Sequence, residues 1–346
     1  MPINLLRKSL KHNRLTRNLY FGMRNGKVRV SDSIKIHKLA RKFQDYDLLV
    51  VKDRNAGFFS MFLQALCVIR IARKNKQRVV FQFDQGPYFD PERQEKSWWS
   101  YYFEESNTAV WQSELDNASE QKVHEINSRN LLQWFSRLGS RFERRAAQQL
   151  ASEFILKKEV TEAVQAFKQT HFGQGFVIGL HYRGTDKVQG RGIEAYRVDY
   201  HSIDEIINAI STLEIPFRLF VATDEEKFIQ HLDTNDKIEI IYTDSLRSDH
   251  NWPVHLSEGQ RSNYQLGIDA LLDSVLLSQC DILLRTESNL SRASEFFNPT
   301  LESINLSREH TYARNDLTKR PEPNLDHIRN QVASAYRRKQ AEIPGK

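Results

Sequence analysis

The hydrophobic residues of this chain gather in short runs that alternate with longer amphipathic stretches. The runs are rich in β-branched and aromatic residues, a pattern typical of strands. We expect strands at residues 47–52, 78–83, 176–182, 217–222, 237–243, 281–286 and 301–306. Between the first two runs, the pattern of Gly57–Lys74 predicts a helix. Because the runs are continuous, they indicate parallel strands that helices cover on both faces.

The expected strands fall into two groups, which indicate an α/β protein with two Rossmann-like halves and a crevice for ligands at the carboxyl ends of the strands. The stretch at about 90–160 contains SWWSYYF and then SRFERRAAQQLASEF, and we interpret it as an aromatic and helical insertion. We expect an N-terminal α/β domain over 1–165, a C-terminal Rossmann-like domain over 166–315 and a basic tail over 316–346. A length of 346 residues agrees with about two domains.

The composition is that of a globular protein, with 40% hydrophobic and 27% charged residues, and this excludes a disordered chain. The net charge of +6 favours an anionic partner, which can be a nucleotide phosphate, nucleic acid or a membrane surface. Cys67 and Cys280 lie far apart in apolar stretches, so we expect buried thiols and no disulfide framework or cysteine-based zinc site. With no signal-peptide pattern and no apolar run of about 20 residues, we expect a cytoplasmic protein without a transmembrane helix.

The strongest chemical signal is IGLHYRGTDKVQGRGIEAYR at 178–197, where an expected strand runs into charged residues and a glycine-rich loop. Arg183 is suited to clamp a diphosphate through two hydrogen bonds. Either Asp186 or Glu194 is a candidate general base, with Lys187 to orient it or tune its pKa. The alternative is a surface turn in which Asp186 pairs with Arg183 or Lys187.

Two later segments add acidic and hydroxyl side chains. Asp269 and Asp273 lie four residues apart on one face of an expected helix, and a buried carboxylate needs a partner. Asp273 is a candidate base-reading group, and the alternative is a hydrogen bond to a neighbouring strand or to Arg285. Ser288 and Asn289 stand where a helix begins, a position that attracts phosphate and that also needs an ordinary cap.

These motifs resemble those of a known family. HYRGTDKVQGRGIEA (181–195) is similar to the His-x-Arg-Arg-x-Asp-Lys segment of the GDP-fucose-dependent fucosyltransferases, especially the α-1,6-fucosyltransferases and nodulation-factor fucosyltransferases. LFVATDEEKFIQHL (219–232) and GIDALLDSVLLSQCDILLRTESNLSR (267–292) follow in the same order. The resemblance covers the second half of the chain. Gly184 stands in place of the second arginine of the motif.

The resemblance implies a GT-B-like fold, with two Rossmann-like domains facing a central cleft and the nucleotide sugar bound mainly by the C-terminal one. It implies an inverting, metal-independent transfer of L-fucose from GDP-fucose to a glycan hydroxyl, with no cofactor. The matched positions imply that His181 and Asp273 contact guanine and that Arg183 binds the diphosphate, with Ser288 or Asn289 near the β-phosphate. They also imply a donor-site acidic pair at Asp224 and Glu225. Acid–base chemistry is implied at Asp186, Lys187 and Glu194.

Other functions remain open from the sequence. The chain could use a different GDP-sugar. It could instead be a basic protein with an inert transferase fold that binds nucleic acid or a membrane surface. The basic ends of the chain, at residues 7–17 and 337–339, favour this binding protein. No recognised nucleic-acid motif accompanies them. We expect a nucleotide sugar and an oligosaccharide or glycolipid acceptor as partners, a peripheral contact with the inner face of a membrane, and no nucleic acid. The SWWSYYF segment would either stack on acceptor sugars or pack internally.

Overall fold

The structure is a computed structural model that describes residues 37–126, 149–184, 198–234, 238–249, 254, 260–306 and 324–342. They form two compact units. The first takes its residues from 1–52, 64–81 and 105–153, and the second from 53–63, 82–104 and 154–346. The domain boundaries expected from the sequence stay predictions. Two segments of the N-terminal half, 53–63 and 82–104, pack with residues of the C-terminal half in the second unit.

The first unit contains a four-stranded sheet in the order β3-β2-β1-β4. Its strands are β1 Leu48–Lys52, β2 Arg78–Gln82, β3 Ala109–Val110 and β4 Val123–Ile126, and the short helix α5 is Gln112–Asp116. β1 and β2 were expected, whereas β3 and β4 lie in the stretch interpreted as an insertion. These two edge strands pair in parallel with β2 and β1. They are too short, and β4 (VHEI) too polar, to form a continuous apolar run.

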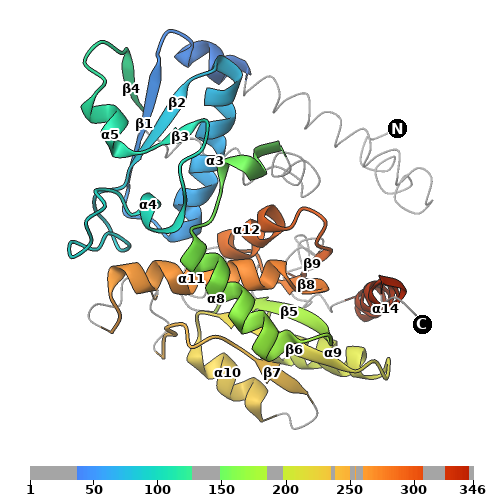
Figure 1. Cartoon of the computed structure of the whole chain (residues 1–346). Coiled ribbons are helices and arrows are strands. Elements are labelled where there is room, and N and C mark those ends of the chain that lie inside the picture. The colour runs from blue at the N-terminus through green and yellow to red at the C-terminus, as the bar shows by residue number, and fades with distance from the viewer. Residues whose placement is uncertain are drawn as a thin grey trace, which may run out of the picture. The chain divides into compact units, whose positions relative to one another are not determined.

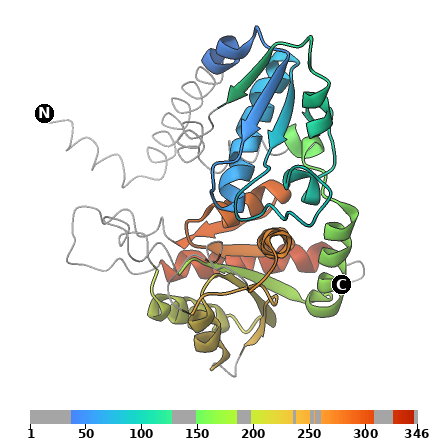
Figure 2. The same cartoon turned by 90° about the vertical axis from the view of Figure 1, so that its left-hand side faces the viewer.

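Helix α3, Phe58–Asn75, follows β1 at the place predicted for a helix. Its apolar side chains, such as Leu66, Ile69 and Ala72, are buried, and Figures 1 and 2 show the helix lying along the first sheet. Arg73 and Lys74 stand in its last turn, where positive charge is favourable beside the helix dipole.

The second unit contains a five-stranded sheet in the order β7-β6-β5-β8-β9, and all neighbouring strands are parallel. The strands are β5 Phe176–Tyr182, β6 Phe217–Thr223, β7 Glu239–Ile241, β8 Ile282–Arg285 and β9 Ser303–Asn305. Each lies within or overlaps a run that predicted it. Every residue of the central strand β5 is buried, as a continuous apolar run in a parallel sheet requires. The α/β class with two parallel sheets is therefore confirmed.

Helices cover both faces of this sheet, as Figure 1 shows. Alternate residues of β5, including Ile178 and Leu180, pack against the helices α9 (Tyr200–Ser211), α10 (Glu226–Asp233) and α14 (Leu325–Glu342). Helix α11 (Asn263–Ser278) lies on the opposite face, next to Gly179. A Cβ atom at Gly179 would lie 3.0 Å from Cys280 Sγ, so the absence of a side chain there allows the close approach.

Three shorter helices complete the described part of the second unit. They are α4 Trp99–Tyr102, α8 Lys158–Phe167, which continues as a π-helix over Lys168–Phe172, and α12 Asn289–Phe297. A 3₁₀ turn at Ala151–Glu153 belongs to the first unit.

Helix α14 lies in the segment expected to be a basic tail. It buries Ile328, Val332 and Ala335 in the core of the second unit. Its basic residues make ion pairs with the sheet: Lys339 Nζ lies 2.7 Å from an Asp281 carboxylate oxygen, and Arg338 lies 2.6 Å from Glu302. Part of the positive charge near the C-terminus is therefore paired with carboxylates of the second unit.

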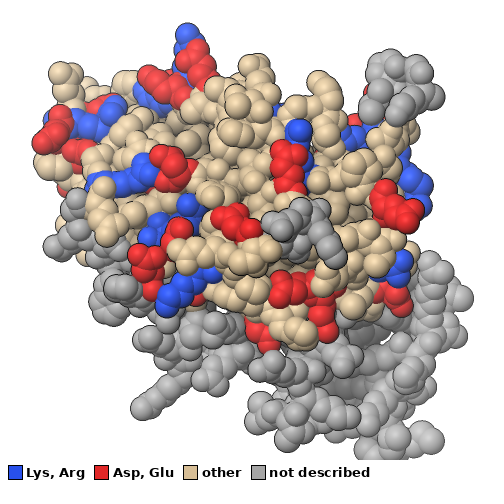
Figure 3. Space-filling model, turned by 90° about the horizontal axis from the view of Figure 1, so that it is seen from below, with Lys and Arg blue, Asp and Glu red and all other residues tan. Residues whose placement is uncertain are grey.

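Surface charges bear on the basic-protein alternative. On the face seen in Figure 3, Lys and Arg side chains are interspersed with Asp and Glu. No helix in the part of the chain that the structure describes is long and apolar enough to cross a membrane.

Candidate functional site

Three neighbouring strands of the second sheet end in polar residues at the same edge. His181, near the end of β5, is aligned with Ala222 on β6 and with Arg285 on β8. Because the strands are parallel, the residues that follow them, Arg183, Asp224 and Thr286, come together. In an open parallel sheet this edge is where ligands bind.

Arg183 and its neighbours form a hydrogen-bonded group at this edge. Arg183 Nη1 lies 3.0 Å from Asp224 Oδ2, and both side chains are mostly buried. The other oxygen, Asp224 Oδ1, accepts a hydrogen bond from the Gly184 N–H at 3.0 Å. The backbone N–H of Arg183 donates to Thr286 Oγ1 at 2.9 Å. Asp224 and Thr286 therefore hold the end of β5, and Arg183 forms an ion pair with Asp224.

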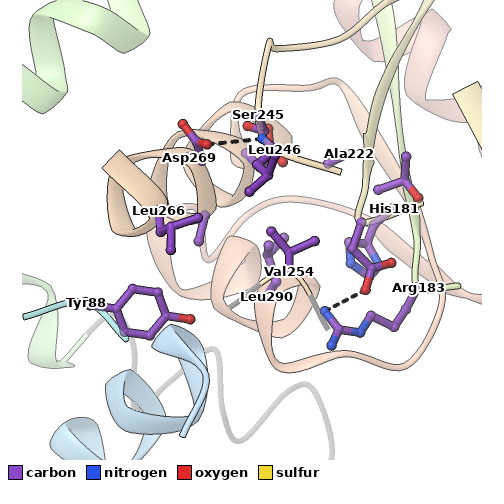
Figure 4. A pocket seen from close by; sticks show the side chains of 14 residues that line it. Tyr88, His181, Arg183, Ala222, Ser245, Leu246, Val254, Leu266, Asp269 and Leu290 are labelled. Atoms are coloured by element: carbon purple, nitrogen blue, oxygen red, sulfur yellow. Dashed lines mark hydrogen bonds and ion pairs between the residues drawn. The ribbon is translucent and has the colours of Figure 1, made fainter. Parts of the chain in front are cut away.

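An open pocket lies beside this group. Figure 4 shows residues from several segments converging on it. Its lining comprises Tyr88, His181, Arg183, Ala222, Thr223, Asp224, Ser245, Leu246, Val254, Leu266, Asp269, Ala270, Asp273 and Leu290. Four predicted donor-site residues, His181, Arg183, Asp224 and Asp273, thus share one pocket.

Asp273 presents a carboxylate from the middle of α11. Its Oδ1 accepts hydrogen bonds from Thr243 Oγ1 at 2.6 Å and from Ser245 Oγ at 3.3 Å. Among the described residues, none donates to Oδ2. Burial raises the pKa of Asp273 to about 7, although the Thr243 hydroxyl and the charge of Arg247 act in the opposite direction. The residue is 6% exposed and lines the pocket.

Tyr88, which sequence reasoning missed, reaches the pocket from the segment after β2. Its hydroxyl oxygen accepts a hydrogen bond from the Phe58 N–H at 2.9 Å. Figure 4 shows the hydroxyl group directed into the pocket. Burial raises the pKa of Tyr88 to about 12, so the group remains an O–H donor at neutral pH. Arg183 is close enough for its charge to lower this pKa in part. No motif marks a tyrosine 95 positions before Arg183 in the sequence.

His181 is 3% exposed, and its Nδ1 lies 3.3 Å from Thr286 Oγ1. The same hydroxyl contacts the Arg183 backbone, so Thr286 orients both residues. Thr286 is the last residue of the apolar run DILLRT, and this position at the end of an expected strand is the only feature of the sequence that marks it as a site residue. Arg285, considered as a partner of Asp273, pairs instead with Glu295 at 3.1 Å in the interior.

The predicted phosphate contacts at the start of α12 are placed differently. Ser288 is the N-cap, and its hydroxyl accepts a hydrogen bond from the Leu290 N–H at 3.2 Å. Ser288 and Asn289 are outside the pocket lining, whereas Leu290 is part of it. The ordinary cap is therefore present, and the phosphate role of Ser288 or Asn289 stays a prediction.

Glu225 precedes α10 and is 5% exposed. Its carboxylate lies against Gly184: a Cβ atom at Gly184 would come within 1.9 Å of Glu225 Oε2. A larger residue at position 184 would therefore displace Glu225. The acid–base candidates Asp186, Lys187 and Glu194 lie outside the described residues.

The SWWSYYF segment is packed inside the second unit. Trp98, Trp99, Tyr101, Tyr102 and Phe103 are each at most 4% exposed. Trp99 and Phe103 stack with ring centroids 4.3 Å apart. Of the two readings of this segment, internal packing is the one that the structure supports, and these rings do not offer a face to sugars.

Metal ligands and known folds complete the description. Within the described ranges, no group of three or more His, Cys, Asp or Glu side chains could hold a metal ion. No protein-family model and no curated protein matches the sequence.

Solved structures do match the fold. A crystal structure of NodZ alpha-1,6-fucosyltransferase co-crystallized with GDP is 13% identical and has a TM-score of 0.50, covering 75% of this chain and 95% of that chain. A NodZ structure soaked with GDP-fucose is 14% identical with the same TM-score of 0.50, covering 81% and 97%. The chain has the fold of these fucosyltransferases. The GT-B-like architecture and the resemblance inferred from the three motifs are confirmed at the level of the fold.

Proposed function

We propose that the protein is an inverting glycosyltransferase that moves L-fucose from GDP-fucose to a hydroxyl group of a glycan. The observation that carries this proposal is the pocket in which His181, Arg183, Asp224 and Asp273 meet at the carboxyl edge of the second sheet. The fold shared with NodZ, whose structures contain GDP or were soaked with GDP-fucose, supports the same donor.

In this proposal the pocket binds the two ends of the nucleotide differently. Asp273 accepts hydrogen bonds from the guanine N1–H and N2–H₂ groups, beside His181. Arg183 and the Tyr88 hydroxyl bind the diphosphate, and Arg183 exchanges part of its contact with Asp224 for phosphate oxygens. As the sugar–phosphate bond breaks, negative charge grows on the leaving GDP, and a fixed guanidinium stabilises that charge more in the transition state than in the ground state.

The transfer itself is a single displacement. The acceptor oxygen forms a bond to the anomeric carbon as the bond to the phosphate oxygen breaks, GDP leaves with the electron pair, and the configuration inverts. The acceptor proton goes to a carboxylate, for which Glu194 and Asp186 are the candidates. Arginine and hydroxyl donors take the place of a metal ion at the diphosphate. We propose an oligosaccharide or glycolipid as the acceptor, and a cytoplasmic enzyme at the inner face of a membrane.

The proposal is tested by binding and turnover. Calorimetry with GDP, GDP-fucose, GDP-mannose and UDP-glucose, with and without EDTA, should show tightest binding for the guanine nucleotides and no effect of EDTA. Release of GDP from GDP-fucose in the presence of glycan acceptors should fall by about 10²–10³ in Arg183→Ala, as for other lost charge contacts in preorganised sites.

The matched control is Arg218→Ala. Arg218 lies on the same strand, β6, but at the end opposite to the pocket. Its Nε lies 2.8 Å from Glu239 Oε2. We expect this variant to keep its turnover. Near-normal turnover in Arg183→Ala, or no binding of any guanine nucleotide, would refute the proposal.

A further inference from the structure

Residues 243–248, which follow β7, link the two ends of the pocket. Thr243 and Ser245 donate to Asp273 at one end. At the other end, the Ser248 N–H donates to the Asp224 carbonyl oxygen at 2.9 Å. Leu246, between them, lines the pocket. The orientation of Asp273 therefore depends on the position of the 243–248 segment.

Asp269 and Arg261 fasten the middle of this segment. Asp269 Oδ2 accepts a hydrogen bond from the Leu246 N–H at 3.1 Å, which Figure 4 shows, and lies 3.3 Å from Arg261 Nε. Arg261 also donates to the backbone carbonyl of Asp244. The second oxygen, Asp269 Oδ1, accepts from Gln265 Nε2 at 2.9 Å. Asp269 and Arg261 thus connect the start of α11 to the backbone of residues 244–246.

The two carboxylates on α11 are arranged for different tasks. Both are 6% exposed and line the pocket, one helical turn apart. Both carboxylate oxygens of Asp269 accept hydrogen bonds from groups within the protein. Asp273 is bonded only through Oδ1 by the described residues, so Oδ2 is left for a ligand. A contact to ligand fits Asp273, and a positioning role fits Asp269.

We propose that Asp269 and Arg261 are positioning residues that set the base selectivity of the pocket. They hold the 243–248 segment so that Thr243 and Ser245 stay on Oδ1 of Asp273 and Oδ2 remains directed at the base. This inference rests on the proposed guanine-nucleotide donor. A carboxylate held this way favours a base with adjacent N–H donors, as in guanine. It disfavours hypoxanthine, which lacks the amino group, and adenine, which presents an acceptor at N1.

The experiment compares GDP, inosine diphosphate and ADP by calorimetry in the full chain. The unmodified protein should bind GDP about tenfold more tightly than inosine diphosphate, because one hydrogen bond to a charged group is lost. In Arg261→Gln we expect GDP binding to weaken and the ratio of GDP to inosine diphosphate affinity to fall to about twofold. The reason is that an Asp273 carboxylate that is no longer held in place forms a weaker hydrogen bond with the guanine amino group. Arg261→Lys, which keeps the charge, should restore most of the ratio. Arg218→Gln is the control and should leave it unchanged.

A second readout separates positioning from a general loss of stability. Thr243 and Ser245 donate to the ionised form of Asp273, Arg247 favours that form and Asp269 opposes it. If the Thr243 and Ser245 hydroxyls no longer bond to Asp273 in the variant, the pH at which half of the GDP affinity is lost should therefore rise. A lower stability of the fold alone would not change that pH. If Arg261→Gln does not fold, Asp269→Asn carries the same expectation for the GDP to inosine diphosphate ratio.

The outcomes are distinct. No GDP binding by the unmodified protein would overturn the proposed function and this inference together. Selective GDP binding by the unmodified protein, with an equal ratio and an equal pH midpoint in Arg261→Gln, would overturn this inference alone.

Discussion

The two parallel sheets end in loops of contrasting character. After β1 and β2, most of the loop residues are packed internally, although Tyr88 reaches the pocket. Asp53, which follows β1, accepts a hydrogen bond from the Trp98 indole N–H at 2.5 Å, and the Trp98 ring packs against Phe58 and Phe83. After β5, β6 and β8, the loops line an open pocket with charged side chains. The same type of strand end can therefore support either a core or a binding site.

Two buried aspartates make the contrast concrete. Burial raises the pKa of both Asp53 and Asp273. Asp53 accepts hydrogen bonds on both oxygens, from the Asn55 N–H and the Trp98 indole, so each oxygen has a donor within the protein. Asp273 is bonded through one oxygen by the described residues. The difference teaches that the open bonding capacity of a buried carboxylate, rather than its burial, distinguishes a binding group from a structural one.

The largest expected effect is on the packed loops. Trp98→Ala should lower the free energy of unfolding by about 3–5 kcal/mol, because it removes a fully buried ring and the donor to Asp53 Oδ2. Urea denaturation measures this loss. Trp111→Ala is the control, since Trp111 is 41% exposed and should change stability little. Equal effects of the two substitutions would contradict the packing role.

The paired substitutions Asp53→Asn and Asp273→Asn sharpen the comparison. Asp273→Asn should weaken GDP binding by about 1–3 kcal/mol and leave stability nearly unchanged, because it removes a charged acceptor from the pocket. Asp53→Asn should lower stability by a similar amount and spare GDP affinity. Calorimetry and urea denaturation of both variants test the pair, and the comparison fails if both lose the same property.

The pH dependence should have opposite signs for binding and stability. Asp273 must be ionised to accept both guanine donors, so GDP affinity should fall about tenfold for each pH unit below its pKa of about 7. Its folded pKa is above the usual value of 3.8, so the protonated carboxyl stabilises the free protein. That contribution is lost as the pH rises from 3.8 to about 7. Calorimetry and denaturation across this range check both trends. Asp273→Asn should lose the pH dependence of GDP affinity and show a smaller loss of stability with rising pH, since Asp53 and Asp269 also have raised pKa values.

The smallest effect is a packing effect at the binding edge. Gly184→Ala should cost about 1 kcal/mol of stability, the lower end for overpacking, because the flexible end of Glu225 can move away. Gly175→Ala is a matched control, since its Cβ would meet its nearest neighbour at an ordinary 3.6 Å. Thermal denaturation compares the two. No difference between them would show that Glu225 does not confine position 184.

Much of the second unit could be predicted from the sequence. Continuous apolar runs marked β5, β6 and β8, and the polar residue after each run marked the edge where Arg183 and Asp224 meet. These are local signals, read from a strand and the residues next to it. The short edge strands β3 and β4 have no such signal. They are stabilised by pairing with β2 and β1, and not by a hydrophobic run of their own.

The remaining site residues depended on tertiary structure. Tyr88 enters the pocket from a segment that packs on residues far along the chain, as in the hydrogen bond from Asn263 Nδ2 to the Phe89 carbonyl. The difference between Asp269 and Asp273 is also invisible in the sequence, where they are two acids on one helix face. By itself, the sequence determined the apolar strands, their order along the chain and the chemistry available at their ends, but not the edge strands β3 and β4. Only the tertiary structure decided which hydrogen-bond capacity was used internally, because that depends on partners brought together by folding.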